Sequence, residues 1–268
     1  MRISVSSSDE LIRLDNFLSS RLIQFSRSKI QKLILNGSIT VNNKAAKKNL
    51  KLSYGDTIEV DKNSLEINEI SKTLKKWDYP LEVIYKDNNF AIINKPLGVI
   101  SHPTANNKEK TLVNIILNKF EKELSGHPDP LRPGIVHRLD KETSGLLIVA
   151  KNNLSHSKLG QQFNNHSIER KYLCLVWGVI RPLQGRIETF IIRDKKNRQL
   201  MTVSDIKGKK AITNYKTIKV FNIRDIPKIS LIECKLETGR THQIRVHMKY
   251  KGAALLGDNQ YGKKNIKF

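Results

Sequence analysis

The segment GIVHRLDKETSGLLIVAKN, residues 134–152, places charged and polar side chains between two apolar runs. Asp140 lies at the centre of the polar stretch between these runs, with Arg138 and Lys141 close to it and His137 three residues before it. Nearby positive charges favour the ionised form of a carboxyl group. An ionised Asp140 could therefore act as a nucleophile, a base, a metal ligand or a salt-bridge partner that stabilises a turn. The residue types alone leave these roles open.

Other chemistries that these residue types could support lack the motifs they need. A hydrolase that used Ser144 and His137 would carry a Gly-x-Ser-x-Gly turn around the serine, and this segment has none. No Gly-x-x-x-x-Gly-Lys-Ser/Thr sequence for binding a nucleotide phosphate occurs in the chain. Cys174 and Cys234 each stand alone in an apolar pattern, so we interpret them as structural thiols. The sequence therefore predicts neither a metal site nor a cofactor.

The apolar runs on both sides of Asp140 predict a polar loop that is held by a sheet. Residues 145–150, GLLIVA, are typical of a core strand. Further strand-like segments cover residues 81–85, 89–95, 171–178, 186–192, 212–221 and 229–238, and helical patterns cover residues 109–124 and 153–168. This order predicts an α+β fold with a mixed or antiparallel central sheet and flanking helices. We expect this larger domain to span residues 81–268, after a linker over residues 63–80.

The N-terminal part, residues 1–62, predicts a separate small α/β domain. Two stretches of apolar residues at helical spacing predict two short helices, with Ser26 as the cap of the second helix and Gly37 at its end. Residues 38–43 and 56–60 are strand-like. We therefore expect a helical pair on a small sheet.

The composition indicates a folded protein with a polyanionic partner. The chain of 268 residues has 48 Lys and Arg against 25 Asp and Glu, a formal net charge of +23 at pH 7. Such a balance is typical of nucleic-acid-binding proteins, and an apolar fraction of 38% argues against a disordered basic tail. The N-terminus lacks the apolar core of a signal peptide, and no run of about 18 apolar residues occurs. We therefore expect a cytoplasmic protein that binds no membrane.

Part of the N-terminal region resembles a known RNA-binding module. The sequences RLDNFL, FSRSKIQKLILNG and YGDTIEV, within residues 12–60, are similar to S4-like RNA-binding domains. Between residues 13 and 35 there are five basic residues and one acidic residue, a density that suits a phosphate backbone. A solvated helical face is the alternative interpretation. The predicted RNA-binding residues in this region are Arg13, Ser26, Arg27, Lys29 and Lys32.

Four segments of the larger domain resemble the RluA-type ribosomal large-subunit pseudouridine synthase family. They are IINKPLGVISHP at 92–103, GIVHRLDKETSGLLIVAK at 134–151, ERKYLCLVWG at 169–178 and LETGRTHQIRVHM at 236–248. The resemblance implies isomerisation of uridine to pseudouridine in RNA, with large-subunit (23S) ribosomal RNA as the expected partner. This reaction needs no cofactor, and we expect a monomer without an obligate protein partner.

The resemblance also implies roles for single residues. Asp140 takes the place of the family's essential aspartate, and Arg245 that of the arginine that pairs with it. Tyr172 matches the active-site tyrosine, on which the detached uracil could stack. Arg138 matches the arginine implicated in flipping the target base, and His137 is a further candidate for an RNA contact. Without the resemblance, Tyr172 predicts strand packing, and an RNA-phosphate contact is the alternative role of Arg245.

The chain also departs from the family pattern. Family members continue past the GDNQYG sequence with a further segment, whereas this sequence stops at KKNIKF, so we expect a shortened C-terminus that affects the sheet edge and the activity. GAALLGD replaces the usual Gly-His-Pro form in a loop after the last motif. The main alternative function is a non-catalytic RNA-binding or ribosome-assembly factor on a decayed synthase fold. A general basic DNA-binding protein is a third interpretation.

Overall fold

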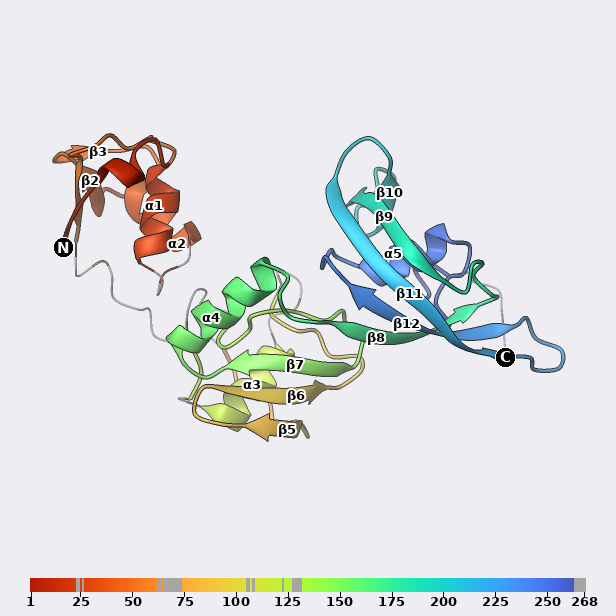
Figure 1. The fold of residues 1–268 in the computed structure, drawn as a ribbon. Helices are drawn as coiled ribbons and strands as arrows, with labels where there is room; N and C mark the ends of the chain where they lie inside the picture. The colour runs from red at the N-terminus through yellow and green to blue at the C-terminus, as the bar shows by residue number, and fades with distance from the viewer. Residues whose placement is uncertain are drawn as a thin grey trace. The chain divides into compact units, whose positions relative to one another are not determined.

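Helices and antiparallel sheets follow one another along the chain, which confirms the predicted α+β class (Figure 1). The computed structural model describes residues 1–22, 25, 27–61, 64, 74–104, 107, 109–121, 123–126 and 132–262. The chain divides into two units, Met1–Phe163 and Asn164–Phe268. Within the described ranges, no helix has the length and apolar character needed to span a membrane. The predicted domain and linker boundaries stay predictions, and most of the linker lies outside the described residues.

The N-terminal region forms the expected helical pair on a small sheet. Its strands have the order β1-β4-β2-β3, with β1 at Arg2–Ser4, β2 at Ile39–Val41, β3 at Lys44–Ala45 and β4 at Thr57–Val60. The helices are α1 (Leu14–Arg21) and α2 (Arg27–Leu35). Phe17, Ile30 and Ile58 are almost completely buried in the core that joins helices and sheet. Gly37 follows α2 with a φ of +81°, a conformation that favours glycine after a helix, and the predicted cap Ser26 lies outside the described residues.

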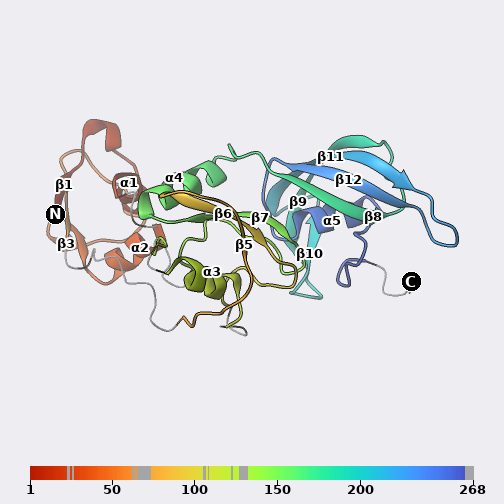
Figure 2. The ribbon, with the colours of Figure 1, turned by 90° about the horizontal axis from the view of Figure 1, so that it is seen from below.

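A three-stranded antiparallel sheet forms the remainder of the first unit. Its order is β5-β6-β7, with β5 at Glu82–Lys86, β6 at Phe90–Lys95 and β7 at Gly145–Ala150. Helix α3 (Leu112–Phe120) lies along one face of this sheet (Figure 2), and α4 (Asn153–Asn164) follows β7. Both helices end about four residues before their predicted ends. Glu121, at the end of α3, has a φ of +45°, which a continuing helix cannot have.

The second unit is a five-stranded antiparallel sheet covered on one face by a helix. Its order is β10-β9-β11-β12-β8, with β8 at Lys171–Trp177, β9 at Gln184–Arg193, β10 at Met201–Ser204, β11 at Lys209–Phe221 and β12 at Ile229–Leu236. Helix α5 (Gln243–Tyr250) lies along one face of this sheet (Figure 1). Its Met248 is buried in one core with Ile232 and Cys234 of the sheet. All seven strands predicted for the larger domain are present, whereas β10, α5 and the N-terminal strands β1 and β3 were not predicted.

Candidate active site

The predicted loop around Asp140 leads directly into β7. Before the loop, the chain lies against β7: the amide of Ala150 donates to the carbonyl oxygen of Gly134 at 2.8 Å. Gly134 has a φ of +71°, and a Cβ at this position would lie 2.7 Å from the side chain of Val149. The close approach therefore requires glycine here. As a result, the backbone is fixed to β7 at Gly134, before the loop, and the loop ends where β7 begins at Gly145.

The segment after β6 also holds the loop, through Gly98 and Ser101. The Ser101 hydroxyl donates to the carbonyl oxygen of Leu139 at 2.7 Å and accepts from the Leu139 amide at 3.3 Å. Both residues are buried, with 1% of Ser101 and 6% of Leu139 exposed. The amide of Gly98 donates to the carbonyl oxygen of Lys141 at 2.9 Å. Hydrogen bonds therefore hold the backbone on each side of the half-buried Asp140.

Lys95, the last residue of β6, places a buried positive charge near the same loop. The Nζ donates to the backbone carbonyl oxygens of Lys141, at 3.3 Å, and of Pro96 and Val99, both at 2.8 Å. Burial lowers the pKa of Lys95 to about 8, and the carboxylates of Glu142 and Asp140 oppose this shift. A pKa of about 8 leaves the amine protonated at pH 7. Asp140 therefore lies in the field of a cation that the sequence analysis missed.

His137 and Arg138 begin the loop in different environments. The Nε2 of His137 accepts a hydrogen bond from the amide of Ile148 at 3.0 Å, and its ring stacks on Phe163 at 4.4 Å between centroids. The fold thus fixes the orientation of this ring. Arg138 is exposed, and its Nη1 lies 3.4 Å from Nε2 of the buried His102. The predicted RNA contacts of His137 and Arg138 stay predictions.

Tyr172 belongs to the second unit and lies in β8. It is opposite Cys234 of β12 in the sheet register, and it packs against the core in which Cys234 and Met248 are buried. Ile244 of α5 packs against the same core. Tyr172 therefore has the strand-packing position that its periodicity predicts, and its active-site role stays a prediction. Cys174 and Cys234 are free thiols, with their Sγ atoms 4.0 Å apart.

Polar anchors hold helix α5 on the sheet. The Nε2 of Gln243 donates to Thr213 Oγ1 at 2.9 Å, and the Nδ1 of His247 lies 2.9 Å from the same oxygen. The Nε2 of His247 lies 3.0 Å from Thr189 Oγ1. Burial lowers the pKa of His247 to about 4, so its ring is neutral at pH 7. The sequence analysis missed both anchors, although Gln243 and His247 have the i, i+4 spacing that places two side chains on one helix face.

Arg245 lies between these anchors in sequence and is held by a carboxylate. Its Nε and Nη2 donate to the two oxygens of Asp258, at 2.7 and 2.8 Å. Arg245 lies in the second unit and Asp140 in the first, so their predicted pairing stays a prediction. The structure brings Arg138, His137 and Asp140 into one loop, and it attaches Tyr172 and the helix of Arg245 to one core.

Two of the predicted RNA-binding arginines have a partner within the N-terminal region. Arg13 and Arg27 both donate to the buried carboxylate of Asp15, with nitrogen–oxygen distances of 2.9 to 3.1 Å, and Gln31 donates to it at 2.6 Å. Burial by itself raises the pKa of Asp15, but the hydrogen bonds from these residues outweigh that effect and lower it to about 2. The side chains of Arg13 and Arg27 remain 41% and 48% exposed, so they also reach solvent.

The other predicted residues of this surface differ in exposure. Lys32 is exposed and Lys29 half-buried, while Ser26 lies outside the described residues. None of these observations tests a contact with RNA, and the RNA-binding roles stay predictions.

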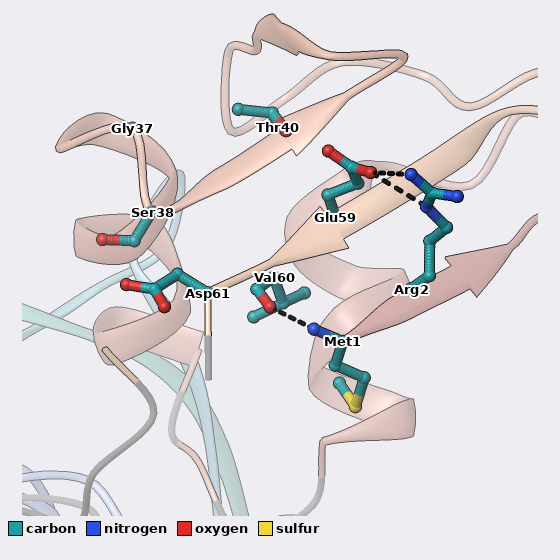
Figure 3. Close-up of a pocket in the computed structure, with 8 residues that line it drawn as sticks. All are labelled: Met1, Arg2, Gly37, Ser38, Thr40, Glu59, Val60 and Asp61. Atoms are coloured by element: carbon teal, nitrogen blue, oxygen red, sulfur yellow. Dashed lines mark hydrogen bonds and ion pairs between the residues drawn. The ribbon is translucent and has the colours of Figure 1, made fainter. Parts of the chain in front are cut away.

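A hollow of about 390 Å³ in the N-terminal region contains none of the predicted site residues. Figure 3 shows its lining: Met1, Arg2, Gly37, Ser38, Thr40, Glu59, Val60 and Asp61. The Arg2 guanidinium is paired with Glu59 at 2.6 Å, and the amino group of Met1 donates to the carbonyl oxygen of Val60 at 2.5 Å (Figure 3). Because both cations that line the hollow, the Arg2 guanidinium and the Met1 amino group, are bound within the protein, we assign this hollow no part in RNA binding.

Comparisons with known proteins agree with the resemblance in the motifs. Residues 89–250 match the RNA pseudouridylate synthase family, and residues 12–58 match the S4 domain. The uncharacterized RNA pseudouridine synthase YlyB of Bacillus subtilis is 41% identical over 267 residues, which make up 99% of this chain and 84% of that protein. Ribosomal large subunit pseudouridine synthase D of Zymomonas mobilis is 41% identical over 265 residues, 97% of this chain and 80% of that protein. The solved structure of human RNA pseudouridylate synthase domain containing 1 matches with a TM-score of 0.56 and 25% identity, over 69% of this chain and 70% of that one.

Proposed function

Because this chain belongs to the RNA pseudouridylate synthase family, we propose that it isomerises uridine to pseudouridine in large-subunit ribosomal RNA, with Asp140 as the catalytic carboxylate. The assignment of Asp140 rests on one observation: hydrogen bonds hold the backbone of its loop on both sides of this residue. Hydrogen bonds from the buried side chains of Ser101 and Lys95 hold the backbone at Leu139 and Lys141, the two neighbours of Asp140. A reacting group must be held in a defined position, and such a loop does so.

The reaction exchanges one bond for another within the same nucleotide. The bond from N1 of uracil to C1′ of ribose breaks, the base turns, and a bond from C5 to C1′ forms; C5 loses a proton and N1 gains one. No atom or electron is gained or lost overall. An ionised carboxylate such as Asp140 can attack the ribose or the base as a nucleophile, or remove a ribose proton as a base.

Three further residues of this chain are proposed to serve this step. Arg245 keeps the carboxylate of Asp140 ionised, because a guanidinium favours the charged form of a nearby carboxyl group. Tyr172 offers a flat ring on which the detached uracil stacks, which contributes roughly 1–3 kcal/mol per base. Arg138, exposed at the start of the loop, occupies the space that the flipped base leaves in the RNA, since unstacking a base costs free energy that another group must offset.

The ribosomal RNA substrate is proposed from the relatives and from the N-terminal domain. The Zymomonas mobilis relative is named for the ribosomal large subunit. The S4 domain match at residues 12–58 adds a basic module to the larger domain, and Arg13, Arg27 and Lys32 there reach solvent. A tethered module that binds phosphates raises the affinity of the whole chain without reading which uridine is modified. A ribosomal RNA substrate also accords with the cytoplasmic location expected from the sequence.

The test is to incubate the purified chain with protein-free large-subunit ribosomal RNA and to map pseudouridines by carbodiimide-dependent stops of reverse transcription. We expect a stop with the wild type, and a rate at least about 1,000-fold lower with Asp140→Asn, which removes the charge but keeps the shape. Filter binding should give equal RNA affinities for the two proteins. Full activity of Asp140→Asn would contradict the assignment of this residue. Tight RNA binding by a wild type that forms no product would instead identify a non-catalytic RNA-binding factor.

A further inference from the structure

A buried ion pair joins helix α5 to the segment that follows it. Arg245 donates through Nε and Nη2 to the two carboxylate oxygens of Asp258, at 2.7 and 2.8 Å, and this geometry is bidentate. Only 14% of the Arg245 side chain and 5% of the Asp258 side chain are exposed. Nη2 also donates to Gln260 Oε1 at 2.7 Å. The Nε–Nη2 edge of the guanidinium is therefore held by three acceptor oxygens of two residues, which fixes the plane of the group.

Asp258 is itself held in place by the backbone of its own turn. Its Oδ1 accepts hydrogen bonds from the amides of Gln260 and Tyr261, at 3.0 and 3.1 Å. Burial by itself raises the pKa of Asp258, but the hydrogen bonds from Arg245 and from these amides outweigh that effect and lower it. The carboxylate is thus ionised at neutral pH and cannot rotate without losing these bonds.

An aromatic ring flanks the guanidinium. The Arg245 Cζ lies 4.7 Å from the centre of the Tyr261 ring, a distance that allows a cation–π interaction. Tyr261 is 4% exposed, and its hydroxyl accepts from the amide of Met201 at 2.7 Å and lies 2.8 Å from Nδ1 of His242. The Tyr261 ring is therefore fixed in place beside the guanidinium of Arg245. Hydrogen bonds to Asp258 and Gln260 hold the same guanidinium along its Nε–Nη2 edge.

Helix α5 does not need the Arg245–Asp258 ion pair to stay on the sheet. Gln243 and His247 already anchor the helix through Thr213, and Val246 and Met248 are buried beneath it. A buried ion pair often contributes little net stability, because desolvation of both charges offsets their attraction. What the pair adds beyond these anchors is a defined direction for one guanidinium.

We infer that Asp258 is a positioning residue for the proposed reaction: it holds in one orientation the guanidinium of Arg245, the group that is proposed to keep the catalytic carboxylate ionised. Asp258 acts through Arg245 and touches neither the RNA nor the reacting atoms. This inference rests on the proposed function. It assigns a purpose to the acidic residue of the GDNQYG sequence, Asp258, to which the sequence analysis gave no role.

The variant Asp258→Asn tests the inference. Asparagine keeps an oxygen for the amides of Gln260 and Tyr261, so the turn is retained, while the charge and the second acceptor for Arg245 are lost. We expect the single-turnover rate at saturating ribosomal RNA to fall about 10- to 100-fold, because a displaced reacting group slows a step on that scale. RNA affinity should stay within about twofold of the wild type, since phosphate contacts elsewhere dominate it.

The matched control is Asp225→Asn. Asp225 lies between β11 and β12 with 89% of its side chain exposed, and its φ of +65° is one that asparagine adopts readily. We expect this variant to have the wild-type rate. Thermal melting of both variants shows whether either change unfolds the second unit.

A double-mutant cycle separates positioning from a merely structural effect. If Asp258 acts through Arg245, the double variant Arg245→Lys, Asp258→Asn should have a rate within about twofold of that of Arg245→Lys alone. Multiplicative losses in the double variant would overturn the inference. A wild-type rate in Asp258→Asn would overturn it while leaving the proposed function intact, whereas a wild type without product would refute the proposed function and this inference with it.

Discussion

The variant Ser101→Ala tests whether one buried hydroxyl holds the loop of Asp140. Ser101 makes two hydrogen bonds to the backbone of Leu139, at 2.7 and 3.3 Å, and water has little access because only 1% of Ser101 is exposed. Alanine leaves the buried carbonyl and amide without these bonds. Each unsatisfied buried group costs about 1–3 kcal/mol. Because the longer bond is the weaker one, we expect the free energy of unfolding to fall by about 2 kcal/mol.

The effect on the rate should exceed what this loss of stability explains. Asp140 follows Leu139 directly, so a looser Leu139 displaces the carboxylate. A displacement of about 1 Å can cost about 100-fold in rate. We expect single-turnover pseudouridine formation, measured by quantified carbodiimide-dependent stops at saturating RNA, to slow by about 10- to 100-fold. RNA affinity, measured by filter binding, should not change.

Ser230→Ala is the matched control for this variant. Ser230 is completely buried in the second unit, and its hydroxyl donates to the carbonyl oxygen of Gly178 at 2.6 Å. Its loss should lower stability by a similar amount and leave the rate unchanged. Equal rates in the two variants, at equal folded fractions, would refute the reasoning that Ser101 positions the loop.

Two further predictions concern stability. Gly134→Ala should lower the free energy of unfolding in urea by about 3 kcal/mol, because its φ is +71° and the new Cβ would lie 2.7 Å from Val149. Gly98→Ala is the control, because Gly98 has a φ of +79° and an added Cβ would have no neighbour within 4 Å, so this change introduces backbone strain without a clash. An equal loss of unfolding free energy in the two variants would argue against a clash with Val149. Asp15, whose pKa falls from 3.8 to about 2, should contribute about 2 kcal/mol above pH 4, and this stability is lost as the pH falls through 2. The difference in unfolding free energy between wild type and Asp15→Asn should therefore narrow below pH 4; a constant difference would contradict the ion-pair account.

The sequence by itself determined most strands of both units and the polar loop around Asp140. A buried strand is a short run of consecutive apolar residues that ends at polar or turn residues, so the sequence alone reveals it. Residues 145–150 and 171–177 illustrate this, and both are strands in the structure. The charged residues between the apolar runs around Asp140 likewise had to form a loop, because a charged segment does not continue a buried strand. These properties depend on neighbours in the chain alone.

Helix α5 shows where local pattern misleads. Ile244, Val246 and Met248 alternate as they would in a strand, and the sequence analysis predicted no helix there. The structure forms a helix because Gln243 and His247, one turn apart, both reach Thr213 of β11. The helix is thus selected by contacts with a distant strand, which outweigh the weak preference of the local sequence.

Only the tertiary structure decided what holds the site. Lys95 occupies the buried register of β6 after Ala91 and Ile93, but a buried lysine requires acceptors, and the fold supplies one of them from Lys141. Ser101 reaches Leu139 across 38 positions of the chain. Whether a polar side chain is buried, and what satisfies it, depends on residues that folding brings together from separate segments. No periodicity within a single segment encodes such contacts.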